Sequence, residues 1–191
     1  MRGGRLVDGC IRQPGFGGRP TRCRRAWAVL SDCGKYRYRL GRDVSEDGGV
    51  YPHAGYVLWI MLNPSTADGS CDDNTIRRCI GYTRAWGYSQ LLVGNLYAFR
   101  STDPARLWKS DDPYGPENRL HLCQMACEAA LILVAWGQHA KREDASPLAA
   151  LLSGFADLWC LGVGGQNKPK HPLILSATTP RVLYLPKRLA R

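Results

Sequence analysis

Polar side chains follow the apolar stretches of this chain at the points where each stretch ends. They are Asn63, Asn95, the Gln-His pair at 138–139, and His171. A carboxamide group both donates and accepts hydrogen bonds, so asparagine suits recognition of a ligand with both kinds of edge. Ligands of open α/β sheets bind outside the carboxyl ends of the strands, so we expect chemistry at 63–68. The alternative is an ordinary loop between a strand and a helix, closed by its Asn, Ser and Thr side chains.

Apolar runs bounded by turn residues predict the elements that must position these side chains. The predicted strands are 56–62, 90–95, 130–136 and 157–161, and the predicted helices are 73–87, 116–129 and 147–152. A β-hairpin over 27–40 precedes them. The strand–helix alternation predicts an α/β fold, a three-layer α/β/α sandwich around a central, mostly parallel, four-stranded sheet.

Positive charge is concentrated near the N-terminus. The chain has a net charge of +10, and residues 1–42 alone hold 11 Lys and Arg against Asp8 and Asp32. Residues 1–25 are rich in Gly, Arg and Pro and predict a basic, flexible arm, followed by a single domain over 26–191. Such an arm favours a polyanionic partner, most simply nucleic acid, although a solubilising tail has the same composition.

Several classes of protein are disfavoured by the sequence. No apolar run reaches the length of a membrane span, and the N-terminus lacks the pattern of a secretory signal, so we expect a cytoplasmic, monomeric protein without membrane contact. The eight cysteines form no CxxC pair, which disfavours a metal site, and we expect neither a metal nor a cofactor. The segment 162–168 lacks the spacing of a phosphate loop, and Ser65 lacks the GxSxG context of a serine hydrolase.

Four short motifs resemble the uracil-DNA glycosylase superfamily in type and in order. They are MLNP at 61–64, LLVGN at 91–95, LVAWGQHA at 133–140 and KHPL at 170–173. In that superfamily an early strand ends in GxDP or GxNP, a second in Asn, a later one in WGxHA, and a C-terminal loop carries His-Pro. The sequence is also similar to an uncharacterised bacterial family with an LNPSTAD signature, over residues 36–175.

The first resemblance implies a monofunctional DNA glycosylase that flips a pyrimidine out of DNA and hydrolyses its N-glycosidic bond. It implies that His171 stabilises the departing base and that Asn63 positions the attacking water, with Asp68 or Asp73 as an assisting carboxylate. The expected base-binding residues are Ser65, Thr66, Asn95, Tyr97 and His139. The expected DNA contacts are Arg100, Lys168, Lys170, Leu173 and Leu175, the leucines as an apolar wedge.

Two residues depart from the superfamily pattern. Met61 stands where the motif has glycine. Ser65 stands where the uracil-specific enzymes have a tyrosine that excludes substituents at pyrimidine C5. This indicates a 5-substituted cytosine or uracil as the substrate, such as phage DNA carries, and a role in DNA repair or anti-phage defence. The alternatives are a non-catalytic nucleic-acid-binding module and a hydrolase of free nucleotides or nucleosides.

Overall fold

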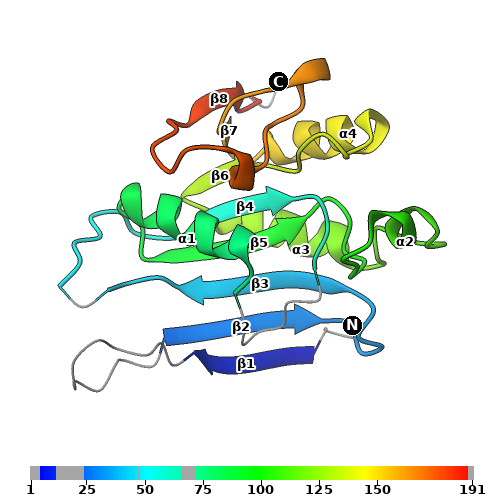
Figure 1. The fold of residues 1–191 in the computed structure, drawn as a ribbon, viewed down its shortest axis with the longest axis horizontal. Helices are drawn as coiled ribbons and strands as arrows, with labels where there is room; N and C mark the ends of the chain where they lie inside the picture. The colour runs from blue at the N-terminus through cyan, green and yellow to red at the C-terminus, as the bar shows by residue number, and fades with distance from the viewer. Residues whose placement is uncertain (1–4, 12–23, 47, 66–71, 189–191) are drawn as a thin grey trace.

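One mixed sheet of eight strands forms the centre of the protein, in the order β1-β2-β3-β5-β4-β6-β7-β8 (Figure 1). The structure is a computed structural model that describes residues 5–11, 24–46, 48–65 and 72–188. The strands are β1 (Arg5–Ile11), β2 (Arg24–Leu30), β3 (Arg37–Asp43), β4 (Val57–Met61), β5 (Gln90–Asn95), β6 (Leu131–Val134), β7 (Leu158–Cys160) and β8 (Val182–Leu185). The pairings among β5, β4, β6 and β7 are parallel, and the other four pairings are antiparallel.

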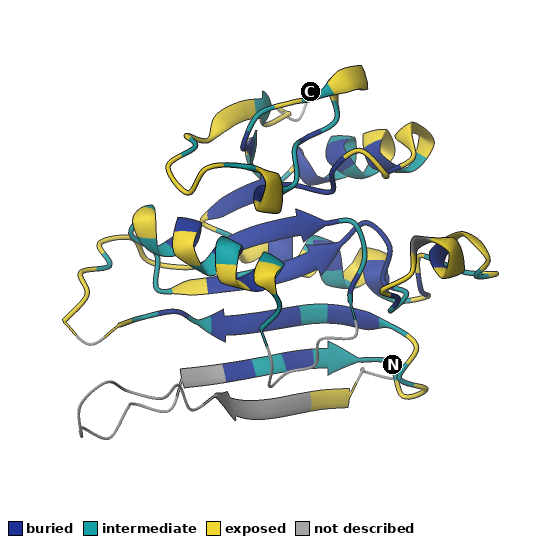
Figure 2. Ribbon diagram, viewed as in Figure 1, coloured by how far each residue is buried: buried dark blue, intermediate teal, exposed yellow. Residues whose placement is uncertain are grey.

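Helices cover both faces of the central strands. The helices are α1 (Asn74–Ala85), α2 (Pro104–Trp108), α3 (Asn118–Glu128) and α4 (Arg142–Leu152), with 3-10 turns η1 (Gly165–Asn167) and η2 (Pro172–Ile174). The side chains of β4 alternate between two cores. Trp59 packs with α1 on one face, while Leu58 and Ile60 pack with α3 and α4 on the other. All five residues of β4 are therefore buried, and Figure 2 shows the central strands as the most buried part of the molecule.

Helix α1 has the local structure that its sequence predicts. Asp73 is its N-cap, and the side chain accepts a hydrogen bond from the Ile76 amide at 2.8 Å. Ile76 and Cys79 recur at helical spacing and are buried against the sheet. Gly87, with a φ of +77°, follows the helix in a conformation that side chains disfavour.

The structure confirms the general α/β class and the hairpin, which β2 and β3 form. The prediction of a four-stranded, mostly parallel sheet is wrong, because the sheet has eight strands and four of its seven pairings are antiparallel. The hairpin joins this sheet rather than preceding it, since β3 pairs antiparallel with β5 from Leu40↔Val93 to Asp43↔Gln90. This pairing joins segments about 50 residues apart, and local sequence patterns do not report such contacts.

Three elements differ from the sequence prediction. Residues 100–115, for which no helix or strand is predicted, contain α2, with Asp103 as N-cap and Pro104 in the first turn. Helix α4 begins at Arg142, five residues before the expected start, and accommodates Pro147 in its interior. The strand β8 adds an antiparallel edge next to β7.

Part of the predicted N-terminal arm belongs to the sheet, because β1 pairs antiparallel with β2 from Arg5↔Leu30 to Ile11↔Arg24. Residues 12–23 of the arm lie outside the described residues. No helix in the described part of the chain has the length and apolar character needed to cross a membrane.

Candidate active site

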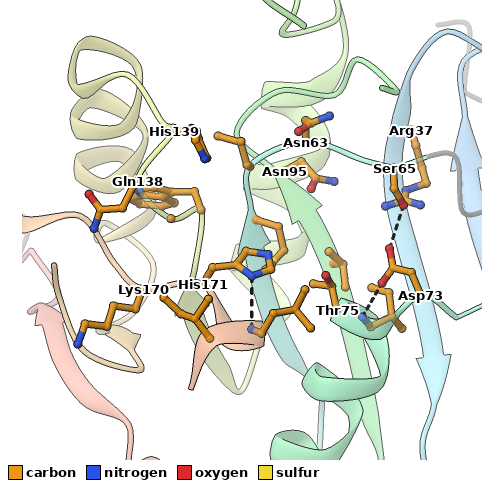
Figure 3. A pocket seen from close by; sticks show the side chains of 18 residues that line it. Arg37, Asn63, Ser65, Asp73, Thr75, Asn95, Gln138, His139, Lys170 and His171 are labelled. Atoms are coloured by element: carbon orange, nitrogen blue, oxygen red, sulfur yellow. Dashed lines mark hydrogen bonds between the residues drawn. The ribbon is translucent and has the colours of Figure 1, made fainter. Parts of the chain in front are cut away.

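A cavity of about 470 Å³ lies at the carboxyl ends of the parallel strands, and we call it the strand-end cavity. Its lining comes from β3, the exits of β4, β5 and β6, the start of α1, and the loop that contains η2 (Figure 3). The register pairs Met61 with Asn95, so the exits of β4 and β5 reach the cavity together. Its volume is in the range of small-molecule sites, which runs from about 300 to 1,000 Å³.

Asn95 provides a buried polar group in this cavity. The residue is 1% exposed, and its Nδ2 has no hydrogen-bond acceptor among the described residues. It follows Leu91 and Val93 on the α1 face of β5, because side chains alternate along a strand. Leaving a buried amide without a partner costs about 1–3 kcal/mol, so a ligand that accepts this hydrogen bond would gain affinity.

Asn63, at the exit of β4, is half-buried and holds its loop in place. Its Nδ2 donates to the Ser101 carbonyl at 2.8 Å and to the Pro64 carbonyl at 3.2 Å. These two bonds assign the amide orientation, which leaves the Oδ1 atom as the acceptor. Asn63 therefore closes the loop after β4, as the alternative of an ordinary strand-to-helix loop predicts. It also lines the cavity, where its Oδ1 atom can accept a hydrogen bond from a water molecule and orient it.

His171 precedes η2 and caps it. Its Nδ1 accepts a hydrogen bond from the Leu173 amide at 3.4 Å, so the proton of the neutral ring lies on Nε2. Burial lowers the pKa of His171, and the nearby Asp73 carboxylate opposes this effect to a smaller extent. The ring is therefore neutral near pH 7 and presents Nε2–H as a donor.

Asp73 is the carboxylate that the structure places in the cavity. One oxygen caps α1, as described above, and the other accepts a hydrogen bond from the Ser65 hydroxyl at 2.9 Å (Figure 3). Ser65 also lines the cavity, so the two residues form one polar wall. Asp68 and Thr66, which are also expected at the site, lie outside the described residues.

The opposite side of the cavity carries Gln138, His139 and Lys170 (Figure 3). The mouth there has exposed apolar side chains, because Leu173 is 44% exposed and its neighbour Ile174 is 73% exposed.

The structure brings most of the proposed site residues together. The strand-end cavity is lined by Asn63, Ser65, Asp73, Asn95, His139, Lys170, His171 and Leu173. Within the described part of the chain, the proposed residues that do not line it are Tyr97, Arg100, Lys168 and Leu175.

Each of these four residues has a contact elsewhere. Tyr97 is fully buried and donates to Asp144. Arg100 donates to the Gly34 carbonyl at 3.1 Å, and Lys168 donates to the Gln138 carbonyl at 2.8 Å. Leu175 packs against the α1-side core.

Arg37, which was not predicted as a site residue, lies at the start of β3 and is 3% exposed. It lines the cavity on the side of Ser65 and Asp73 (Figure 3). Burial, together with the charge of Arg100, lowers the pKa of Arg37 to about 10, so the guanidinium stays charged at neutral pH. Nothing in the local pattern distinguishes it from a solvent-facing hairpin residue. Thr75, a further residue that was not predicted, lines the cavity from α1.

Among the described residues, no group of three or more His, Cys, Asp and Glu side chains is arranged to hold a metal ion. The polar groups that the described residues place in the cavity are instead amides, hydroxyls, imidazoles, one carboxylate and basic side chains. This set can bind a polar heterocycle, orient water and stabilise a departing anion.

Comparison with known proteins identifies a family but no activity. Searches of the curated proteins and of the solved structures found no significant match. One family model, described as "Protein of unknown function (DUF1643)", matches residues 37–173. The match begins at Arg37 and ends at Leu173, so it contains all the lining residues named above except Ile174. Because it covers more than half of the chain, the protein belongs to the DUF1643 family.

Proposed function

We propose that this protein is a monofunctional DNA glycosylase that hydrolyses the N-glycosidic bond of a flipped-out pyrimidine and leaves an abasic site. The observation that carries the proposal is the meeting of Asn63, Asn95 and His171 in one cavity of about 470 Å³. Among the described residues, no hydrogen bond occupies Asn63 Oδ1, Asn95 Nδ2 or His171 Nε2, so each can serve a ligand. The helices on both faces of the sheet fit the expected three-layer α/β/α architecture.

The chemistry divides between these side chains. Water, oriented by Asn63 Oδ1, forms a bond to the anomeric carbon, while the bond from that carbon to the pyrimidine nitrogen breaks and its electron pair stays on the base. The Nε2–H of His171 donates to the pyrimidine O2 and stabilises the departing anion. The proton released by the water goes to the Asp73 carboxylate or to solvent. The geometry favours Asp73 for this role because it lines the cavity.

The pyrimidine edge is recognised by Asn95 in this proposal. The Nδ2 of its amide has no acceptor among the described residues, so this group can donate to an acceptor on the base, while an amide oxygen can accept from a donor on the base. The pocket therefore accepts cytosine and uracil edges alike. Ser65 leaves room beside C5, which supports a 5-substituted pyrimidine and a role in repair or anti-phage defence.

DNA contacts are proposed around the mouth of the cavity. Lys170 is placed for a phosphate contact there, with Lys168 and Arg100 as further candidates, and the exposed Leu173 suits an apolar wedge. Ile174 is a better second wedge candidate than Leu175, because it is 73% exposed whereas Leu175 packs against the core. In this proposal the protein acts in the cytoplasm as a monomer and uses no cofactor.

Alkali-induced strand breakage tests the proposal. Oligonucleotides containing cytosine or uracil, with hydrogen, methyl, hydroxymethyl or a larger group at C5, are incubated with the protein and treated with alkali. We expect breaks at a 5-substituted pyrimidine, reduced about 10²–10³-fold in His171→Ala and strongly reduced in Asn63→Ala. His53→Ala is a matched control, because His53 is exposed and does not line the cavity.

Other outcomes assign the protein to another class. DNA binding without breaks at any pyrimidine would indicate a non-catalytic module, and a strict preference for plain uracil would reject the 5-substituted substrate.

A hydrolase of free nucleotides is the second candidate, and the buried Arg37 favours it. A guanidinium binds phosphate with paired hydrogen bonds, so Arg37 could hold the phosphate of a free nucleotide in the cavity. Chromatography of nucleoside monophosphates after incubation with the protein separates the two activities. Release of the base from free nucleotides, with intact oligonucleotides, would favour this alternative.

A further inference from the structure

A second cavity, of about 370 Å³, lies between α3 and α4, and we call it the α3–α4 cavity. It opens on the sheet face opposite to α1, since Leu96 and Leu122 in its lining belong to the core of α3 and α4. Leu148 and Leu151 of α4 complete an apolar wall. The candidate active site does not use this cavity.

Asn118, at the start of α3, provides a polar group in the α3–α4 cavity and is 4% exposed. Its Nδ2 donates to the backbone carbonyls of Asn95 at 3.0 Å and of Leu96 at 3.3 Å. These bonds assign the other amide atom as Oδ1, and this oxygen has no hydrogen-bond donor within the described ranges. A buried carbonyl oxygen without a donor favours a ligand that carries an N–H group.

The charges around the cavity favour a cation. Of the described residues, Glu143 and Asp144 line it together with one basic residue, Arg119, and both Glu143 and Arg119 are exposed. Asp144 accepts hydrogen bonds from the phenols of Tyr97 and Tyr114. Burial, with the Asp144 hydrogen bond, raises the pKa of Tyr114 to about 12, so this phenol stays protonated and donates to Asp144.

We propose that the α3–α4 cavity binds a small organic cation with an ammonium group and an apolar body. The ammonium donates to Asn118 Oδ1 in the field of Glu143 and Asp144, and the apolar body packs against Leu122, Leu148 and Leu151. The proposal does not depend on the reaction at the strand-end cavity. Asn118 also donates to the carbonyl of Asn95, which lines the strand-end cavity. In this proposal a cation bound to Asn118 therefore contacts a residue that supports the strand-end cavity.

Binding of 2-phenylethylammonium to the whole chain tests this site. Calorimetry measures the affinity, and amide NMR shifts locate the bound ligand. The comparison ligands are 2-phenylethanol, which keeps the size and a hydroxyl donor, and 3-phenylpropanoate, which reverses the charge. We expect saturable binding of the ammonium, about tenfold weaker binding of the alcohol, and no binding of the carboxylate. The amide signals of Asn118, Asn95 and Leu96 should shift, while that of His139, across the strand-end cavity, should not.

Two variants separate the contributions of shape and charge. Leu148→Trp fills the cavity and should remove saturable binding. Glu143→Gln, on the exposed face of α4, should weaken ammonium binding about threefold. Glu128→Gln is the matched control, because Glu128 is exposed on α3 and does not line the cavity, and it should bind like the unmodified protein.

Three results would overturn the proposal. They are absence of saturable ammonium binding, equal binding of the ammonium and the carboxylate, and shifts confined to residues of the strand-end cavity. Equal affinity of the Glu143→Gln and unmodified proteins would reject the charge contribution even if Leu148→Trp removed binding.

Discussion

The two cavities lie on opposite faces of the sheet at the same strand end, and their unpartnered groups are complementary. Asn95 leaves an amide nitrogen in the strand-end cavity, whereas Asn118 leaves an amide oxygen in the α3–α4 cavity. The two residues are joined by the hydrogen bond from Asn118 Nδ2 to the Asn95 carbonyl. The strand-end cavity has the basic side chains of Arg37 and Lys170, while acidic side chains predominate in the other cavity.

This difference shows that two asparagines have different roles, depending on which amide atoms find hydrogen-bond partners within the fold. The side chain of Asn118 supports the backbone through its nitrogen, so it is both structural and available to a ligand. The side chain of Asn95 makes no hydrogen bond with its Nδ2 among the described residues, so recognition explains it better than stability does.

The largest expected effect separates the two histidines of the strand-end cavity. His171→Ala removes the proposed donor to the leaving base and should lower the excision rate about 10²–10³-fold. His139→Ala, on the exposed side of the same cavity, should lower it less than tenfold. Single-turnover cleavage of the best oligonucleotide measures both variants, and equal losses would reject the special role of His171.

Removing each asparagine should affect stability differently. Asn118→Ala leaves the carbonyls of Asn95 and Leu96 without a side-chain donor and should lower the free energy of unfolding by about 1–3 kcal/mol. Asn95→Ala removes a buried polar group whose Nδ2 has no acceptor among the described residues, so it should leave the free energy of unfolding unchanged or raise it while weakening pyrimidine binding. Urea denaturation provides the values, and a larger loss in Asn95→Ala would contradict the comparison.

The pH dependence of excision should reflect the lowered pKa of His171. Once protonated, Nδ1 can no longer accept from the Leu173 amide, so the ring leaves its donor position. Activity should persist as the pH falls through 6.5, the ordinary histidine value, and then decrease about tenfold per pH unit below the lowered pKa. His171→Gln keeps a donor without titrating, so this acid limb should be absent from its rate profile. An acid limb centred above pH 6.5 would contradict the assignment.

A modest effect, on stability alone, is expected at the α3–α4 cavity. Tyr114→Phe removes one phenol donor to Asp144 at an exposed position and should lower the free energy of unfolding by about 1 kcal/mol. The excision rate should not change, because Tyr114 lines only the α3–α4 cavity of the two. Thermal unfolding and the strand-break assay together measure this variant, and a loss of excision at unchanged stability would show that the two cavities are coupled.

Much of the strand-end cavity could be predicted from local sequence patterns. The apolar run before Asn63 and the run before Asn95 predict strands, and parallel strands bring their carboxyl ends to one edge. The capping role of Asp73 follows from its position before a helical repeat. Helix α4 was only partly predicted, because Pro147 normally marks a helix start, whereas here the chain tolerates it inside the helix.

The sequence by itself determined which residues end the strands and which cap the first helix, since these features depend on neighbours a few positions apart. Tertiary structure alone decided that Arg37 would line the cavity and that Asn118 would support Asn95. The first depends on the antiparallel pairing of β3 with β5, and the second on the packing of α3 against β5. Such pairings arise when distant segments bury apolar surface together, and a side chain shows no local sign of the cavity or backbone that it will meet.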